Sequence, residues 1–167
     1  SIVEAIGDRH LLNPVAVWIG SKSWDGIDRL QELYNTLIER EDYPRWLKER
    51  LVHRWLISAV AAAFKPDGFR TRGVLTIQGP QSIGKTAWIG ALVNDPVLKE
   101  ALLKLNHHLD ASNKDSIITA TCHWIVEIGE LDSSLRTDMA RLKGFLTAER
   151  DKVRRPYARS DSDYSRR

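Results

Sequence analysis

Residues Gly79-Pro80-Gln81-Ser82-Ile83-Gly84-Lys85-Thr86 indicate the fold class of this 167-residue chain. They match the pattern G-x-x-x-x-G-K-[ST], in which glycines allow successive backbone N–H groups to turn toward a phosphate. The octet lies between an apolar run, Val74-Leu75-Thr76-Ile77, and a helical pattern that opens at Lys85. Because a strand before the loop and a helix after it separate phosphate-binding loops from chance matches, the sequence predicts a nucleoside-triphosphate site.

The residue types of the loop suit ATP with Mg²⁺ as the bound cofactors. Lys85 supplies a cation for the β- and γ-phosphates, and Thr86 offers a hydroxyl group to the metal. The predicted nucleotide-binding residues are Gly79, Pro80, Gln81, Ser82, Ile83, Gly84, Lys85, Thr86 and Ala87. The alternative is a glycine turn that joins a strand to a helix and binds nothing.

A phosphate site with magnesium also needs acidic side chains, which phosphoryl-transfer enzymes place near the end of a neighbouring strand. The run His123–Ile128 predicts that strand, and Glu130 follows it, so we expect Glu130 to polarise the attacking water. Glu127 lies inside the run, where an unpaired carboxylate is costly, so we expect it to support the magnesium ion. The predicted catalytic residues are Lys85, Glu130 and Glu127, and the predicted metal-side residues are Thr86, Glu127 and Glu130. An exposed position on an edge strand is the alternative for Glu127.

Upstream of the loop the sequence predicts helices. Spacings of three and four predict a first helix over residues 27–39, with a stripe formed by Leu30, Leu33, Tyr34 and Leu37. A second helix is predicted after Tyr43, with Pro44 in its first turn and one face formed by Leu47, Leu51, Trp55, Ala59 and Ala62. The helical region ends at Lys65-Pro66-Asp67-Gly68. We therefore expect an α/β protein with a small helical subdomain over residues 1–66 and a P-loop NTPase core, a parallel sheet flanked by helices, over residues 67–167.

Downstream of the loop, Asn94-Asp95-Pro96 is expected to interrupt the helix, and residues 136–147 are predicted to form another. The end of the chain is basic, since residues 149–167 contain seven Lys/Arg and four Asp/Glu. Residues 152–159 and 164–167 resemble the strands of a β-hairpin joined by a turn over residues 160–163. We expect Lys152, Arg154, Arg155 and Arg159 to contact nucleic-acid phosphates without reading bases. A solvated charged hairpin is the alternative.

Composition excludes several classes of protein. Hydrophobic residues make up 43% of the chain and charged residues 28%, as in an ordinary globular protein. The single cysteine, Cys122, fits a reducing compartment, and no stretch approaches the ~20 apolar residues of a membrane span. His107, His108 and His123 lack metal-ligand spacing. The composition therefore predicts a cytoplasmic protein without a membrane segment.

The chain also resembles the virulence-associated protein E family, relatives of superfamily 3 helicases and of the helicase part of phage primases. The resemblance rests on the following segments: residues 13–14, 24–30, 54–61, 79–86, 124–131, 142–147 and 155–159. The most specific of these are Trp24-Asp25-Gly26-Ile27-Asp28-Arg29-Leu30 and Trp124-Ile125-Val126-Glu127-Ile128-Gly129-Glu130-Leu131.

The resemblance implies a ring-forming, hexameric ATPase motor that moves along single-stranded DNA when a phage or mobile element replicates in a bacterial cell. It implies a basic hairpin inside the ring, and a primase or other replication proteins as partners. Such proteins continue beyond the position of Arg167 to a sensor residue and an arginine finger, so we expect a truncated core that does not turn over ATP alone. The alternatives are a nucleotide-dependent switch or assembly ATPase and, with less support, a small-molecule kinase.

Overall fold

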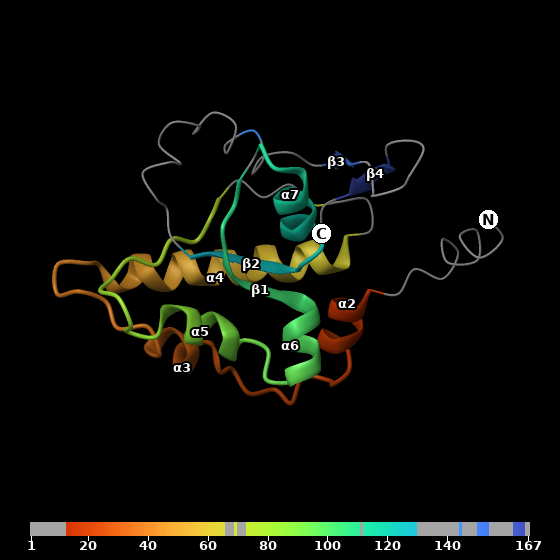
Figure 1. Ribbon diagram of the computed structural model, residues 1–167. Helices are drawn as coiled ribbons and strands as arrows, with labels where there is room; N and C mark the ends of the chain where they lie inside the picture. Colours follow the sequence, from red (N-terminus) through yellow and green to blue (C-terminus); the bar gives the residue numbers. More distant parts are fainter. Residues whose placement is uncertain are drawn as a thin grey trace. The chain divides into compact units, whose positions relative to one another are not determined.

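The computed structural model describes residues 13–65, 69, 73–110, 112–129, 144, 150–153 and 162–165 (Figure 1). The chain forms two compact units, Ser1–Ile38 and Glu39–Arg167. The boundary predicted from the sequence, at residue 66, lies outside the described residues. The long helix α4 (Arg45–Phe64) and the glycine loop belong to the same unit.

In the first unit, α2 (Pro14–Ile19) begins at Asn13, whose side chain accepts hydrogen bonds from the N–H groups of Val15 and Ala16. This is a standard N-cap, with proline in the first turn. Helix α3 (Leu30–Asn35) is shorter than the helix predicted over residues 27–39. The prediction was wrong at both ends, since a turn precedes the helix and the helix stops at Asn35 instead of at residue 39.

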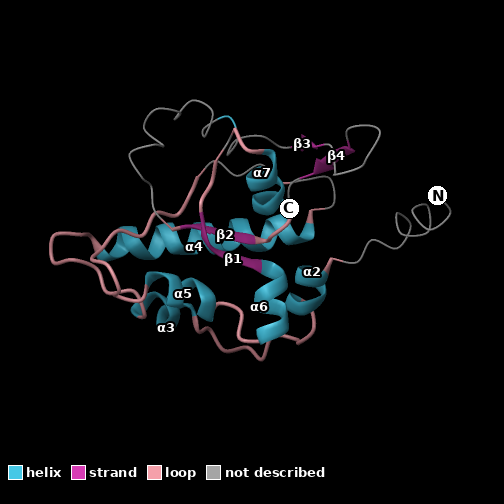
Figure 2. Ribbon diagram, in the orientation of Figure 1, coloured by secondary structure: helices cyan, strands magenta, loops and turns pink. Residues whose placement is uncertain are grey.

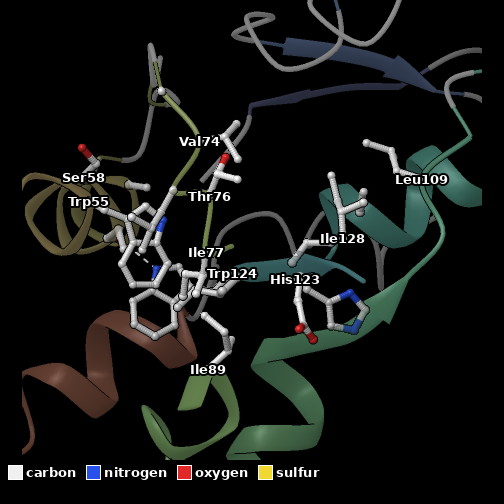
Figure 3. A pocket seen from close by; sticks show the side chains of 18 of the residues that line it. Trp55, Ser58, Val74, Thr76, Ile77, Ile89, Leu109, His123, Trp124 and Ile128 are labelled. Carbon is white, nitrogen blue, oxygen red and sulfur yellow. Dashed lines mark hydrogen bonds between the residues drawn. The ribbon is translucent and has the colours of Figure 1, made fainter. Parts of the chain in front are cut away.

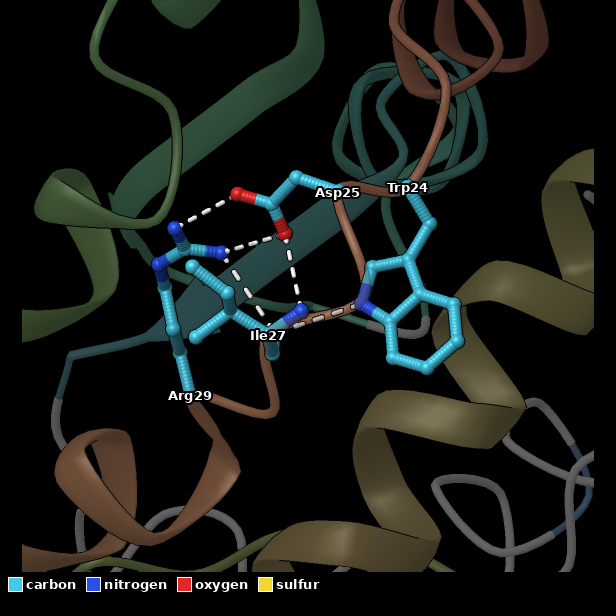
Figure 4. Close-up of polar contacts among 4 residues, drawn as sticks. All are labelled: Trp24, Asp25, Ile27 and Arg29. Atoms are coloured by element: carbon cyan, nitrogen blue, oxygen red, sulfur yellow. Dashed lines mark hydrogen bonds and ion pairs between the residues drawn. The ribbon is translucent and has the colours of Figure 1, made fainter.

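That turn is built on Asp25 (Figure 4). Its carboxylate accepts hydrogen bonds from both guanidinium nitrogens of Arg29, at 2.9 and 2.6 Å, and one from the Ile27 N–H at 3.0 Å. The Arg29 hydrogen bonds, followed by that of Ile27, hold the pKa of Asp25 below its ordinary value. Trp24 Nε1–H donates to the Ile27 carbonyl at 3.2 Å, and Gly26 has a left-handed φ of 83°. The segment is therefore a fixed turn on which 78% of Trp24 is exposed.

Helix α4 is the first helix of the second unit. It begins at Arg45 with Pro44 as the preceding cap residue, whereas the sequence predicted Pro44 within the first turn. The predicted apolar face was wrong in the first half of the helix, where Lys48 and Val52 are buried and Leu51 is 43% exposed. The buried side of this half therefore includes a charged side chain, whose amine lies 2.5 Å from the Glu39 carboxylate.

The sheet of the second unit consists of two parallel strands, β1 (Leu103–His107) and β2 (Ile125–Ile128), shown side by side in Figure 2. Strand β2 lies within the predicted run, whereas β1 was not predicted. Helices α5 (Lys85–Ala91), α6 (Pro96–Leu102) and α7 (Lys114–Thr121) all pack against β1. The chain is thus an α/β protein with a small parallel sheet.

Two further sequence predictions concern the edges of this sheet. The helix break is confirmed, since α5 ends at Ala91 and α6 starts at Pro96 with Asp95 as its N-cap. The predicted strand over Val74–Ile77 is wrong: these residues form no strand in the described structure. A β-branched run becomes a strand only where a neighbour accepts its hydrogen bonds, and in the described structure residues 74–77 are paired with neither β1 nor β2.

Near the end of the chain, β3 (Arg150–Val153) pairs antiparallel with β4 (Ser162–Ser165), and Lys152 lies opposite Asp163. The antiparallel pairing agrees with the predicted hairpin, but β4 begins where a turn was expected. The predicted helix over residues 136–147 lies outside the described residues apart from Gly144. Within the described residues, no helix has both the length and the apolar character of a membrane span.

Candidate functional site

The candidate site is the glycine loop that leads into α5. Gly84 precedes the helix with φ of 94°, a conformation that costs glycine little and other residues much more. Ser82 is also left-handed, with φ of 65°. Alternating left- and right-handed residues make backbone N–H groups converge on one point, which is the geometry of an anion-binding concavity.

Lys85 lies over this loop. Its Nζ donates hydrogen bonds to the carbonyl oxygens of Gly79, at 3.0 Å, and Pro80, at 2.7 Å. Both carbonyls are neutral, so the ammonium charge is solvated by the loop and not neutralised. A phosphate oxygen at the same position would offer Lys85 a stronger, charge-assisted hydrogen bond.

Thr86 joins the loop to the sheet. Its hydroxyl donates a 2.6 Å hydrogen bond to Oε1 of Glu127, which is half-buried on β2. The second carboxylate oxygen, Oε2, accepts a 3.1 Å hydrogen bond from the backbone N–H of Asn106 at the end of β1. Glu127 was expected to need a partner, and each of its two carboxylate oxygens accepts a hydrogen bond. Together the two hydrogen bonds fix the orientation of the carboxylate.

The oxygen atoms of Thr86 and Glu127 fit a magnesium ion. Magnesium prefers hard oxygen ligands, and it commonly takes one or two from the protein while phosphates and water supply the rest. A hydroxyl and a carboxylate that already touch at 2.6 Å are close enough to share one ion. Among the described residues, no group of three or more His, Cys, Asp or Glu side chains is placed to hold a metal ion.

Lys85 and Glu127 line a cavity of about 730 Å³. Its walls come from α4, from residues 73–78 and from residues 123–129. Figure 3 shows Trp55 and Trp124 beside Ile77 at one end of the cavity and Leu109 at the other. The Nε1–H of Trp124 donates to the Ala59 carbonyl of α4 at 2.8 Å. This contact fixes α4 against the start of β2.

Trp88, two residues after Thr86, approaches Trp55 with ring centroids 6.5 Å apart and planes inclined by 40°. Such a tilted aromatic pair contributes about 0.5–1.5 kcal/mol beyond burial. The pair holds α5, and with it the glycine loop, against α4.

Only part of the predicted site lies in the described structure. The described residues Lys85, Thr86 and Glu127 come together, and Ala87 follows them on α5. Lys152 lies on β3, whereas the remaining candidates Glu130, Arg154, Arg155 and Arg159 lie outside the described residues. His107 and His123 donate to the backbone carbonyls of Ser116 and Thr119, which are structural contacts.

Sequence reasoning missed two features of the site: the backbone conformation of Ser82, which it had named as a binding residue, and the residue Asn106. Ser82 adopts its left-handed conformation without any sequence signal, since serine is not enriched there. Asn106 was missed because its strand was not predicted. Asparagine does favour the left-handed region, so a predicted strand ending Leu-Asn-His would have marked the position.

This geometry defines an α/β protein in which a glycine-rich loop opens a helix beside a carboxylate on a parallel strand. Residues 19–167 match the virulence-associated protein E-like domain. Because the match covers most of the chain, the protein belongs to this family, which confirms the resemblance drawn from the sequence. A comparison with curated proteins found no match.

Proposed function

We propose that this chain is the ATP-binding and ATP-hydrolysing motor domain of a replicative DNA helicase of a phage or mobile genetic element. In this proposal the domain acts on single-stranded DNA as part of a ring. The observation that carries it is the Thr86–Glu127 hydrogen bond of 2.6 Å, which joins the glycine loop to a strand about forty residues further along the chain. A glycine turn that only connected two elements would have no need of that contact.

The described side chains have separate roles in the proposed site. The N–H groups of the loop cradle the phosphates, and Lys85 exchanges the carbonyls of Gly79 and Pro80 for phosphate oxygens. Thr86 and Glu127 supply oxygens to Mg²⁺, which neutralises charge on the β- and γ-phosphates when bound. Glu130, which follows β2 in sequence, orients the attacking water in the proposal.

The motor role adds a DNA contact. Family membership and the basic end of the chain support it, with Lys152, Arg154, Arg155 and Arg159 as the phosphate-contacting residues. A nucleotide-dependent switch would use the same phosphate cradle without coupling turnover to DNA. The two functions therefore differ in whether single-stranded DNA raises the rate of ATP turnover.

The test is calorimetric titration with AMP, ADP and ATP, each with and without Mg²⁺, followed by turnover assays with and without single-stranded DNA. The proposal predicts affinity that rises with phosphate number and with magnesium, and turnover that rises with DNA in the assembled protein. Affinity that is equal for AMP and ATP would remove the phosphate-loop assignment. Binding without DNA-stimulated turnover in the assembled protein would favour the switch.

A further inference from the structure

Strand β1 contains one residue more than β2 over the same length of their pairing. Leu103 lies opposite Ile125 and Lys104 opposite Val126, but the next partners are His107 and Ile128. Three steps along β1 therefore correspond to two along β2. Such a bulge leaves one residue outside the regular pairing and redirects it.

Asn106 lies in this irregular stretch and has φ of 50°. Left-handed backbone is uncommon for residues other than glycine, although asparagine tolerates it better than most. In a regular parallel pairing, alternate residues of a strand direct their N–H groups at carbonyls of a given neighbouring strand. Here the Asn106 N–H instead donates to a side chain, Oε2 of Glu127, at 3.1 Å.

Gly129, the residue after β2, lies against Asn106. A Cβ atom added to Gly129 would lie 3.3 Å from Asn106 Cα and 3.2 Å from its Oδ1. Those separations are tighter than ordinary contacts, so any side chain at residue 129 would push on the backbone of Asn106. Glycine at this position therefore permits the close approach of the two strand ends.

We propose that Asn106 is a positioning residue for magnesium binding: its left-handed backbone directs an N–H group at Glu127 and thereby aims the carboxylate at Thr86. This inference rests on the proposed function, because it assigns the contact a role in the same Mg²⁺–nucleotide site. The Asn106 N–H fixes Oε2 of Glu127 and leaves Oε1 directed at the Thr86 hydroxyl. Oε1 and the Thr86 hydroxyl oxygen, the two atoms proposed to bind Mg²⁺, are therefore in place before the metal binds. Hydrogen-bond partners that orient metal ligands commonly change metal affinity 10- to 100-fold when they are removed.

Because the contact comes from the backbone, its removal needs a change of conformation. Asn106→Val keeps the N–H but disfavours positive φ, whereas Asn106→Gly keeps both the N–H and the conformation. Gly129→Ala disturbs the same N–H from the opposite side and is the second variant if Asn106→Val does not fold. Asn94→Val, at an exposed loop position, is the matched control.

The measured quantity is the magnesium advantage, the affinity for ATP with Mg²⁺ divided by that with EDTA. We expect Asn106→Val and Gly129→Ala to reduce this ratio about tenfold or more, with ATP affinity in EDTA unchanged. Asn106→Gly and Asn94→Val keep the wild-type ratio. Independently of nucleotide, the NMR amide resonance of Asn106 shifts in Glu127→Gln, because that substitution changes the acceptor of its hydrogen bond.

The outcomes separate this inference from the proposed function. If wild type shows a magnesium advantage, Lys85→Ala loses ATP binding, and folded Asn106→Val and Gly129→Ala keep the wild-type ratio, the role of Asn106 is overturned and the function stands. An equal reduction of the ratio in Asn106→Gly and Asn106→Val also overturns it, since a backbone role requires the glycine variant to work. If wild type binds no ATP, the proposed function and the role of Asn106 both fall.

Discussion

Lys85 and Thr86 are neighbours in sequence, but their side chains make different kinds of contact. Lys85 donates to two carbonyl oxygens within its own loop, whereas Thr86 donates across to Glu127 on another element. The first contact is local and exchangeable, and the second links loop and sheet. Substitutions of Lys85 and of Thr86 should therefore have different effects on the site.

Lys85→Ala removes the cation that faces the β- and γ-phosphates, and we expect it to weaken ATP binding. The expected loss is at least about 2 kcal/mol, roughly thirtyfold in Kd, as for truncation of one member of a close charge pair. Calorimetry measures it, with Lys114→Ala, an exposed lysine on α7, as the control that should bind normally. Unchanged affinity in a folded Lys85→Ala variant would contradict the assignment.

The two glutamates allow a prediction about their separate roles. Glu130→Gln should leave ATP binding nearly intact and abolish turnover in the assembled protein, because the amide keeps the shape but cannot act as the base. Glu127→Gln should instead weaken the magnesium dependence of binding, since the hydrogen bonds from Thr86 and Asn106 both end on this carboxylate. Loss of turnover in Glu127→Gln alone, with magnesium dependence kept, would reverse the two roles.

At the scale of residues, spacing along the chain predicted that the glycine loop opens a helix and that Glu127 needs a partner. The binding roles of Lys85 and Thr86 stay predictions. The sequence did not predict which groups would face Glu127. That depends on where β1 ends relative to β2, and the one-residue bulge near Asn106 has no pattern in the sequence.

At the scale of elements, helices with clear start and stop signals were predicted best. Pro44 precedes α4, and Asp95-Pro96 opens α6, as the local chemistry of prolines and capping residues dictates. Strand β1 follows α6 with no intervening turn, so it carries no boundary signal. Helix α7 contains a run of isoleucines and threonines with weak helix propensity, and its signal is the Asn113 N-cap, which accepts hydrogen bonds from the N–H groups of Asp115 and Ser116.

The contact between Glu39 and α4 predicts how stability depends on pH. The hydrogen bond from Lys48 is the main cause that lowers the pKa of Glu39 below its ordinary value. A lowered carboxyl pKa stabilises the folded chain above the ordinary glutamate value, and this contribution is lost as pH falls through the lowered pKa. We expect wild type to lose stability to acid more steeply than Glu39→Gln.

Urea unfolding midpoints between pH 7 and pH 3 measure this difference. Glu39→Gln should be the less stable protein at pH 7, because the substitution removes a charged partner from Lys48, of which 9% of the side chain is exposed. Glu41→Gln, a nearby exposed acid, is the control that should follow wild type. If the unfolding midpoints of wild type and Glu39→Gln fall equally as pH is lowered, the Glu39–Lys48 pair does not contribute to the acid dependence of stability.

At the scale of the whole molecule, family membership and the α/β class could be predicted from the sequence, but the extent of the sheet could not. The apolar run Val74–Ile77 has the composition of a buried strand, yet it lines a cavity opposite β2. Composition describes the preference of a segment, whereas a strand also requires a partner at its edge. The same limit applies to the division of the chain, which depends on contacts between distant segments.

The basic end of the chain gives a prediction for DNA binding by the assembled protein. If Lys152, Arg154, Arg155 and Arg159 bind phosphates, replacing Lys152 and Arg155 by alanine should weaken single-stranded DNA binding equally for all sequences. The slope of log affinity against log salt should become shallower by ~0.7 for each phosphate that the variant no longer binds. Filter binding with ATP present and increasing salt measures both quantities.

A second double variant controls for charge alone. Lys99→Ala with Lys114→Ala removes the same charge from α6 and α7, and should change neither affinity nor slope appreciably. If both double variants behave alike, the hairpin is only a solvated charged surface.

The tilted pair formed by Trp55 and Trp88 also makes the loop observable by optical spectroscopy. Two indoles with centroids 6.5 Å apart and planes inclined by 40° couple excitonically, and one of them is on the helix that the glycine loop opens. Any rotation of α5 would therefore change the circular dichroism and the emission of this pair. Trp88→Phe isolates its share of the signal from the other five tryptophans. The protein thus carries an intrinsic optical reporter of loop movement, which can be read without any added label.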